Sequence, residues 1–115
     1  MPKRYRVRWT PVAIWDLDQI IEYLAAREGV DCAIDVHDRI VAEVRTLSTL
    51  PERCRIPLEL LDTGITTYRE LVVEPYGVFF RVSGTKVGII GILDRRRDLE
   101  EILLERALHY TDTEQ

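Results

Sequence analysis

The sequence predicts an α+β fold in the order β-α-α-β-β-β-α: an N-terminal strand, an antiparallel helical hairpin packed on a small antiparallel β-sheet, and a short C-terminal helix. Three observations lead to this fold. Apolar and basic residues alternate at 4–9, two long stretches between residues 11 and 50 have helical periodicity, and three short apolar runs follow between residues 67 and 93. The 115 residues provide for one hydrophobic core, so we expect a single domain over 1–109 and a polar tail at 110–115.

The first two expected elements are a strand and a helix. Residues 4–9 place aromatic or apolar side chains on one face and basic side chains on the other, which is typical of a strand with one buried face. The helix is predicted to begin with Thr10 as its N-cap and Pro11 in its first turn, and to end at Gly29. The basic face of the strand comprises Arg4, Arg6 and Arg8.

A second helix is predicted to start near Asp31, whose carboxylate can cap it, and to run to about Leu50, where Pro51 stops it. The connection between the two helices is short, which favours an antiparallel hairpin. The apolar stripe of the second helix comprises Ala33, Val36, Ile40, Val44 and Leu47.

Three strands and a final helix complete the predicted fold. Residues 51–66 contain two prolines and a glycine without clear periodicity, so we expect an ordered loop there. The last strand is apolar on both faces, which predicts a central place in the sheet. Asp98 is positioned to cap the final helix. The strands are expected at 67–74, 77–83 and 86–93, with turns at 75–77 and 83–85.

The charge of the chain is unevenly distributed. The net charge of -4 argues against a general nucleic-acid binder, which is usually strongly basic. Residues 53–97 nevertheless hold eight bases against five acids, so the pattern predicts a basic sheet flanked by acidic helices. Two cysteines are too few for a disulfide framework, and no signal peptide or membrane-length apolar run is present, so we expect a cytoplasmic protein with no membrane partner.

Five arginines accompany the predicted sheet. Because Arg69 and Arg81 lie on neighbouring strands and Arg95, Arg96 and Arg97 follow the last strand, we expect all five to converge at one rim. Guanidinium groups gathered there suit recognition of a phosphate or a carboxylate. The alternative is that they are solvated charges or ion-pair partners of neighbouring acids. Those acids are Glu70, Glu74 and Asp94.

Candidates for catalysis and metal binding are weak. His37 is expected on a helix and His109 near the tail, and no His, Cys or Asp cluster has metal-ligand spacing. Cys54 lies between two arginines that can lower the pKa of its thiol, but no base lies near it in sequence. We therefore expect no cofactor and no metal, and we assign no confident catalytic residue.

The predicted sheet edge is a candidate binding surface. An exposed edge can accept an added strand, and a groove beside a helical hairpin can accept an amphipathic helix. The three arginines of the first strand either protect this edge from unwanted pairing or attract an acidic peptide.

Four segments carry a family resemblance. They are WTPVAIWDLDQIIEYLA at 9–25, LSTLPERCR at 47–55, YRELVVEPYGVFFRV at 68–82 and ILDRRRDLEEIL at 92–103. In this order, and over nearly the whole chain, they resemble the RelE/ParE superfamily of type II toxin–antitoxin toxins, whose fold is the one predicted above. The resemblance implies a growth-inhibiting protein that is wrapped by the C-terminal segment of an adjacent-encoded antitoxin, in a complex that represses its own promoter. RelE-like members cut mRNA on the ribosome, whereas ParE-like members inhibit DNA gyrase.

Several residues depart from the nuclease pattern of that superfamily. Leu71 replaces one basic residue of the corresponding strand, and Gly77 stands where an arginine usually follows the tyrosine of the first hairpin turn. Asp94 and Ile102 stand where a tyrosine or histidine is often found, while Arg96 matches the arginine at the end of the last strand. Most of the phosphate clamp and the proton-transfer groups are therefore missing.

These departures favour a ParE-like, non-enzymatic inhibitor with DNA gyrase as its expected target and a cognate antitoxin as its partner, with DNA contacted only through the antitoxin complex. The alternatives are a ribosome-dependent mRNA endonuclease that uses Arg69, Arg81 and Arg96, and a non-toxic antitoxin-binding module of the same fold. We predict that the target- or antitoxin-binding residues are Arg69, Arg81, Arg95, Arg96, Arg97 and Tyr76.

Overall fold

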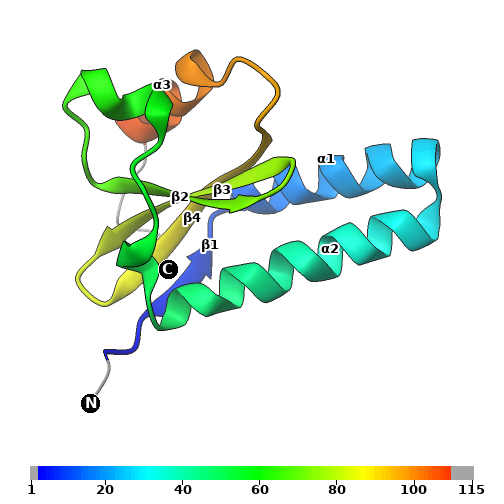
Figure 1. Cartoon of the computed structure of the whole chain (residues 1–115), viewed down its shortest axis with the longest axis horizontal. Helices are drawn as coiled ribbons and strands as arrows, with labels where there is room; N and C mark the ends of the chain where they lie inside the picture. The colour runs from blue at the N-terminus through cyan, green and yellow to red at the C-terminus, as the bar shows by residue number, and fades with distance from the viewer. Residues whose placement is uncertain (1–2, 110–115) are drawn as a thin grey trace.

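The predicted α+β architecture is confirmed. The computed structural model describes residues 3–109, so the tail predicted at 110–115 lies outside the described residues. The elements are β1 (Arg6–Trp9), α1 (Pro11–Glu28), α2 (Val30–Arg45), three 3₁₀ helices η1 (Thr46–Ser48), η2 (Pro51–Arg53) and η3 (Leu58–Thr63), β2 (Tyr68–Val73), β3 (Tyr76–Ser83), β4 (Lys86–Asp94) and α3 (Glu100–His109). The α1–α2 hairpin lies on one side of the sheet, and α3 and η3 lie on the other (Figure 1). None of the helices within residues 3–109 is long and apolar enough to cross a membrane.

The sheet has the strand order β1-β4-β3-β2, so β4 is central as predicted. The pairs β2–β3 and β3–β4 are antiparallel, whereas β1 joins β4 in parallel, and the sheet is therefore mixed rather than wholly antiparallel. The α1–α2 hairpin accounts for the parallel pairing of β1, because the hairpin leaves from the end of β1 and brings the chain back to the start of that strand. There the amide of Tyr5 donates to the main-chain oxygen of Ser48 at 2.8 Å.

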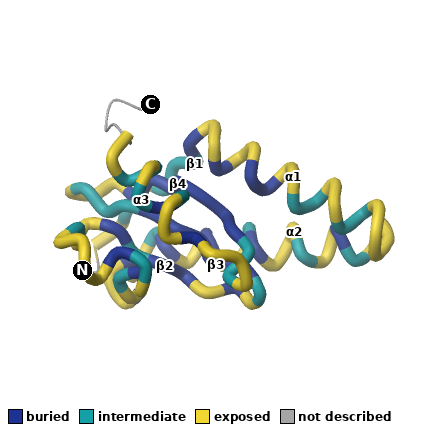
Figure 2. Tube along the Cα trace, turned by 90° about the horizontal axis from the view of Figure 1, so that it is seen from above, coloured by how far each residue is buried: buried dark blue, intermediate teal, exposed yellow. Residues whose placement is uncertain are grey.

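The strands of the sheet are largely buried (Figure 2), and their apolar side chains belong to two cores, one on each face. Strand β4 contains a β-bulge, because Phe79 pairs with Gly91 and Phe80 with Ile89, which leaves Ile90 as the extra residue. The first core, against α1 and α2, includes Ala13, Leu17, Ile40, Val44, Leu47, Leu71, Val73, Val78, Phe80, Val87, Ile89 and Ile92. The second core, against η3 and α3, comprises Leu60, Tyr68, Phe79, Ile90, Leu93, Leu99 and Leu103.

Helix α1 begins as predicted, whereas both ends of α2 differ. The hydroxyl of Thr10 accepts from the amide of Ala13 at 3.3 Å, and Pro11 is the first helical residue. Helix α2 begins at Val30 without a side-chain cap, so the predicted cap at residue 31 is wrong. The same helix ends at residue 45 rather than near residue 50, because the chain tightens into η1, where the hydroxyl of Thr46 donates to the main-chain oxygen of Glu43 at 2.6 Å.

The segments around the strands also differ from the prediction. Tyr76 already pairs with Val73, so the first turn comprises only Glu74 and Pro75 rather than 75–77. The predicted loop at 51–66 contains both η2 and η3. The carboxylate of Asp98 accepts from the amide of the first residue of α3 at 3.3 Å, in agreement with its predicted capping role.

An ion pair supports β4 beyond the end of β1. Strand β1 stops opposite Ile89, and the carboxylate of Asp16 in α1 then accepts from the amide of Ile92 at 3.0 Å. Arg106 in α3 donates to the main-chain oxygen of Ile90 at 3.1 Å and to the same carboxylate, with a second contact of 3.1 Å. Gly91 leaves room for this pair, because a Cβ there would lie 2.6 Å from the Arg106 guanidinium. The side chains of Asp16 and Arg106 therefore bond to the main chain of β4 beyond the end of β1, and their ion pair joins α1 to α3.

Candidate functional site

The structure separates two arginines that were expected to converge. Arg69 lies opposite Phe80 on the sheet face that meets the α1–α2 hairpin, whereas Arg81 lies opposite Tyr68 on the face that meets α3. Successive side chains of a strand point to opposite faces, and directly opposite residues share a face. The two guanidinium groups are therefore on opposite sides of the sheet. Arg69 donates to the main-chain oxygen of Cys54 at 3.2 Å.

Arg81 is also far from the arginines that follow β4. It pairs with Gly88, while Tyr76, five residues earlier in β3, pairs with Asp94 at the other end of β4. Five residues of strand span roughly 17 Å. The predicted rim of five arginines is therefore wrong, and only residues 95–97 lie together at this end of the sheet.

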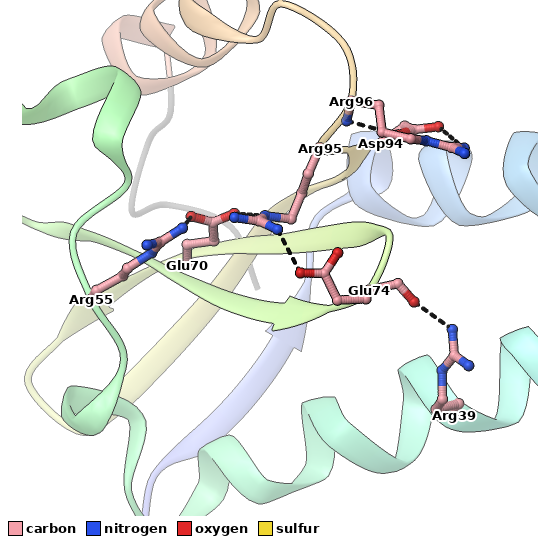
Figure 3. A network of polar contacts seen from close by, with 7 residues as sticks. All are labelled: Arg39, Arg55, Glu70, Glu74, Asp94, Arg95 and Arg96. Carbon is pink, nitrogen blue, oxygen red and sulfur yellow. Dashed lines mark hydrogen bonds and ion pairs between the residues drawn. The ribbon is translucent and has the colours of Figure 1, made fainter.

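Arg95 is held by a buried carboxylate. Its Nε donates to Oε2 of Glu70 at 2.9 Å, and its Nη1 donates to Glu74 at 2.8 Å (Figure 3). Only 3% of the Glu70 side chain is exposed, and its other oxygen accepts from Arg55 at 3.3 Å. Burial alone would lower the pKa of Arg95, but the hydrogen bond and negative charge of Glu70, with those of Glu74, raise this pKa above its usual value. Arg95 is thus a structural cation bound to two acids of the chain itself.

Gly77 provides the space for this buried carboxylate. A Cβ at Gly77 would lie 2.7 Å from Oε2 of Glu70 and 2.9 Å from the ring of Phe79. Both neighbours are buried, so neither can move aside into solvent. The buried carboxylate of Glu70 therefore explains why a glycine stands at position 77, where the nuclease pattern has an arginine.

Arg96 and Arg97 differ from Arg95 in their exposure. Arg96 donates through Nε and Nη2 to both oxygens of Asp94, at 2.9 and 2.6 Å. This hydrogen bonding lowers the pKa of Asp94 below its usual value, although partial burial opposes the shift. Within residues 3–109 the exposed side chain of Arg97 makes no hydrogen bond or ion pair. Of the three, Arg97 is the one whose donors remain available to a partner.

A groove of about 620 Å³ brings three of the predicted residues together. It lies between the α1–α2 hairpin and the end of β4, and its walls include Tyr76, Arg96 and Arg97. Arg39 of α2 fixes the adjoining turn, because its Nη2 donates to the main-chain oxygen of Glu74 at 2.7 Å. We refer to this surface as the hairpin groove.

Sequence reasoning missed the residues that the hairpin contributes to this groove. Tyr23 is 60% exposed, and the guanidinium of Arg27 lies 5.4 Å from its ring centroid. An exposed aromatic four residues before an arginine on a predicted helix was the available signal, because the i, i+4 spacing places the two side chains together. The thiol of Cys32 also lines the groove.

The ionisable groups of the hairpin groove suit binding more than proton transfer. Burial, with a smaller effect of the Asp94 charge, raises the pKa of the Tyr76 phenol, which is therefore protonated at neutral pH. The carboxylate of Asp94 is ionised and engaged by Arg96, so it is poorly placed to accept a proton. The groove consequently offers aromatic surface, cations and the phenol groups of Tyr23 and Tyr76 to a ligand.

Cys54 lies outside the groove. Burial raises the pKa of its thiol and outweighs the opposite effects of Arg53 and Arg69, so the expected lowering by neighbouring arginines is wrong. Across residues 3–109, no group of three or more His, Cys, Asp or Glu side chains is arranged to hold a metal ion.

Comparisons with known proteins agree with this architecture. One solved chain, titled as a chromosomal ParDE toxin–antitoxin system from P. aeruginosa, is 25% identical, with a TM-score of 0.67 over 79% of this chain and 96% of that one. Another, from the RelBE2 toxin–antitoxin complex of Mycobacterium tuberculosis, is 23% identical, with a TM-score of 0.53 over 80% of this chain and 99% of that one. The search of curated proteins found no significant match.

The sequence profile of one family covers most of the chain. That family is described as the ParE toxin of the type II toxin–antitoxin system parDE, and its profile matches residues 7–99. The match extends from β1 through the hairpin and the sheet to the residue before α3. On this evidence of sequence and fold, the chain belongs to the ParE toxin family of type II toxin–antitoxin systems.

Proposed function

We propose that this ParE-family toxin inhibits growth in the cytoplasm by binding DNA gyrase through protein–protein contacts, and that a cognate antitoxin neutralises it. The similar solved structures are of toxin–antitoxin systems, which supports an antitoxin partner. Contact with DNA takes place only through the antitoxin complex, in keeping with a net charge of -4.

The observation that carries this proposal is the internal neutralisation of the arginines at the end of β4. Arg95 is bound by Glu70 and Glu74, and Arg96 is bound by Asp94. A phosphate clamp needs cations whose donors point at the ligand, and a nuclease also needs an acid and a base beside them. The described residues provide neither arrangement at this rim, which favours a binding function over RNA cleavage.

The hairpin groove has the composition of a docking surface for a protein target. Tyrosine and arginine are the residue types that most often carry binding energy in protein interfaces, and Tyr23, Arg27 and Arg97 supply them here. Two of these side chains come from helix α1 and the third from the loop between β4 and α3, so a partner meets a surface that is already formed.

The direct test is inhibition of gyrase supercoiling by the purified protein. We expect Arg97→Glu to raise the concentration needed for half inhibition by roughly three- to tenfold, because the variant places a negative charge in the groove. Arg45→Glu is the matched control: it makes the same charge change at an exposed position on α2, nine residues beyond the last groove residue of that helix. Undiminished supercoiling at a large molar excess of wild-type protein would remove gyrase as the target.

Two further measurements separate the alternatives. Codon-dependent cleavage of mRNA in a translating extract would establish a nuclease instead. Normal growth on induction without the neighbouring gene, combined with antitoxin binding, would identify a non-toxic binding module. Growth arrest with intact mRNA and inhibited supercoiling is the expected combination.

A further inference from the structure

A thiol and a phenol line the hairpin groove together. Cys32, the third residue of α2, contributes the thiol and is partly exposed. Tyr76 lines the groove from the start of β3 and is only 6% exposed, yet within residues 3–109 its hydroxyl makes no hydrogen bond. A buried hydroxyl normally has a hydrogen-bond partner, so the groove lacks an acceptor that a bound molecule can supply.

The Tyr76 hydroxyl reaches the groove. In the described part of the chain, every fully buried side-chain N or O atom has a hydrogen-bond partner, so this unpaired hydroxyl is not among the fully buried atoms. Burial, above all, raises the pKa of the phenol, with smaller effects of neighbouring charges that include Cys32. The phenol is therefore a donor at neutral pH, and the thiol lies near it.

Positive charge predominates around these two groups. The lining of the groove includes three arginines but only two acids, Glu28 and Asp94. Arg96 is bound by Asp94, whereas Arg97 keeps its donors available among the residues that the structure describes. A carboxylate of a bound molecule can therefore accept from the Tyr76 hydroxyl and lie beside Arg97.

The second cysteine of the chain is out of reach of Cys32. Helix α2 has 16 residues and is roughly 24 Å long, with Cys32 in its first turn. Cys54 belongs to the region beyond the other end, where its neighbour Arg53 donates to the hydroxyl of Thr46 at 2.8 Å. Because a disulfide requires Cα atoms within about 7 Å of each other, any disulfide of Cys32 is formed with another molecule.

We propose that Cys32 is a modification site that exchanges with an anionic disulfide of low molecular weight, and that the half bound to Cys32 fills the hairpin groove and excludes the protein target. The Cys32 thiol gives its proton to water, and the thiolate attacks one sulfur of the disulfide. A new S–S bond forms as the old one breaks, and the other half leaves as a thiolate that takes up a proton. Cys32 is oxidised and the disulfide is reduced, so no further oxidant is needed.

The groove has the size and the surface for such a molecule. Its volume of about 620 Å³ lies within the roughly 300–1,000 Å³ of sites that hold small molecules. Ile20 and Val36 supply apolar wall for the carbon chain, while Tyr76 and Arg97 face its carboxylate. An excess of a small thiol reverses the exchange, so the modification follows the redox state of the thiols around the protein.

The exclusion of the target rests on the proposed function, whereas the selection of the disulfide does not. Folded protein is treated with glutathione disulfide, which is anionic, or with cystamine, which is cationic, and peptide mass spectrometry follows the rate at Cys32. Each rate is divided by the rate for the urea-unfolded protein, which removes the intrinsic difference between the two reagents. We expect this ratio to favour glutathione disulfide by at least about threefold, and the preference should fall as salt is added.

Substitutions locate the selecting groups. Arg97→Gln should lower the preference by roughly two- to fivefold, because one cation beside the carboxylate is lost. Arg45→Gln removes the same charge at an exposed position of α2 outside the groove and should leave the preference unchanged. Tyr76→Phe should slow the reaction with glutathione disulfide by roughly two- to tenfold, because a hydrogen-bond donor is lost. Circular dichroism checks that each variant folds.

Gyrase supercoiling measures the consequence of the modification. Fully modified wild-type protein should lose most of its inhibition and regain it after reduction. Cys32→Ser should inhibit gyrase to the same extent before and after treatment with glutathione disulfide, because it has no thiol in the groove to modify. Inhibition that survives full modification of the wild type would overturn the exclusion of the target.

Three other results would overturn the modification site itself. They are equal normalised rates for the two disulfides, faster modification of Cys54 than of Cys32 in the folded protein, and a disulfide-linked dimer in place of the mixed disulfide. Failure of the unmodified protein to inhibit gyrase defeats the proposed target alone, because mass spectrometry still measures the selection of the disulfide.

Discussion

Replacing Glu70 by glutamine tests whether the buried carboxylate organises the end of the sheet. Its side chain is 3% exposed and accepts from Arg95 at 2.9 Å and from Arg55 at 3.3 Å. Glutamine has nearly the same shape but no charge, and its NH₂ group would face one of the two guanidinium groups. Glu70→Gln therefore removes the charge of a buried acid while leaving both of its cationic partners in place.

The expected cost lies between two limits. Leaving a fully buried charge without its partner costs about 3–5 kcal/mol, whereas breaking an exposed pair costs about 0–1 kcal/mol. The side chains of Arg95 and Arg55 are 27% and 46% exposed, so water can solvate part of the charge that is left unpaired. We therefore expect the free energy of unfolding to fall by about 2 kcal/mol.

Glu74→Gln is the matched control, because it removes a carboxylate from the same guanidinium. Glu74 accepts from Arg95 at 2.8 Å, but 71% of its side chain is exposed, so we expect a loss below about 0.5 kcal/mol. Urea unfolding of the two variants measures both values, and Glu70→Gln should lower the midpoint by roughly 1–2 M. Equal losses in the two variants, or a loss below about 0.5 kcal/mol for Glu70→Gln, would refute the argument that burial decides the strength of these contacts.

Three further predictions concern other parts of the fold. Asp16→Asn should lower the free energy of unfolding by about 2 kcal/mol, because it leaves Arg106 without its buried ionic partner. Hydrogen exchange of the Ile92 amide, which donates to Asp16, should accelerate. Unchanged exchange of this amide would contradict the role of the ion pair at the sheet edge. The raised pKa of Tyr76 means that the unfolded state loses the phenol proton first, so stability should fall as pH rises through about 10, and Tyr76→Phe should reduce that fall. Absorbance at 295 nm follows the ionisation, and a phenol that titrates at its usual pKa would contradict the prediction. Cys54 is buried and the pKa of its thiol is raised, so iodoacetamide should label the partly exposed Cys32 first. Mass spectrometry of the labelled peptides measures the two rates. Faster labelling of Cys54 would contradict the prediction and indicate that its surroundings open.

The order of the helices and strands could be predicted from the sequence because each of these elements has a clear local periodicity of apolar residues. Residues 4–9 alternate, the first helix has a capping threonine followed by proline, and the central strand is apolar on both faces. These signals depend only on neighbours in sequence, and the structure confirms the elements they predict. The helix end predicted near residue 50 failed because hydroxyl groups at 46 and 48 bond to main-chain oxygens and tighten the chain into η1.

The placement of the arginines required information that a single sequence lacks. Whether Arg69 and Arg81 share a face depends on the register of β2 against β3, and a shift of one residue would exchange the faces. The bulge at Ile90 similarly moves the last part of β4 by one residue relative to its partner. Tyr23 and Arg27 were unrecognised because the groove exists only when the hairpin lies beside the end of β4.

Register also explains why the buried acid and the nuclease pattern exclude each other in this chain. Glu70 and Gly77 occupy neighbouring strands on the same face, and a Cβ at Gly77 would already approach the carboxylate to 2.7 Å. An arginine at Gly77 therefore cannot be accommodated while the carboxylate stays bound to Arg95 and Arg55 beneath the loop before β2. Adding that arginine would require removal of the acid that neutralises two others. The missing clamp residue and the ion pairs of the rim are thus one structural feature, and of the three arginines that follow β4 only Arg97 keeps side-chain donors open to a partner within residues 3–109.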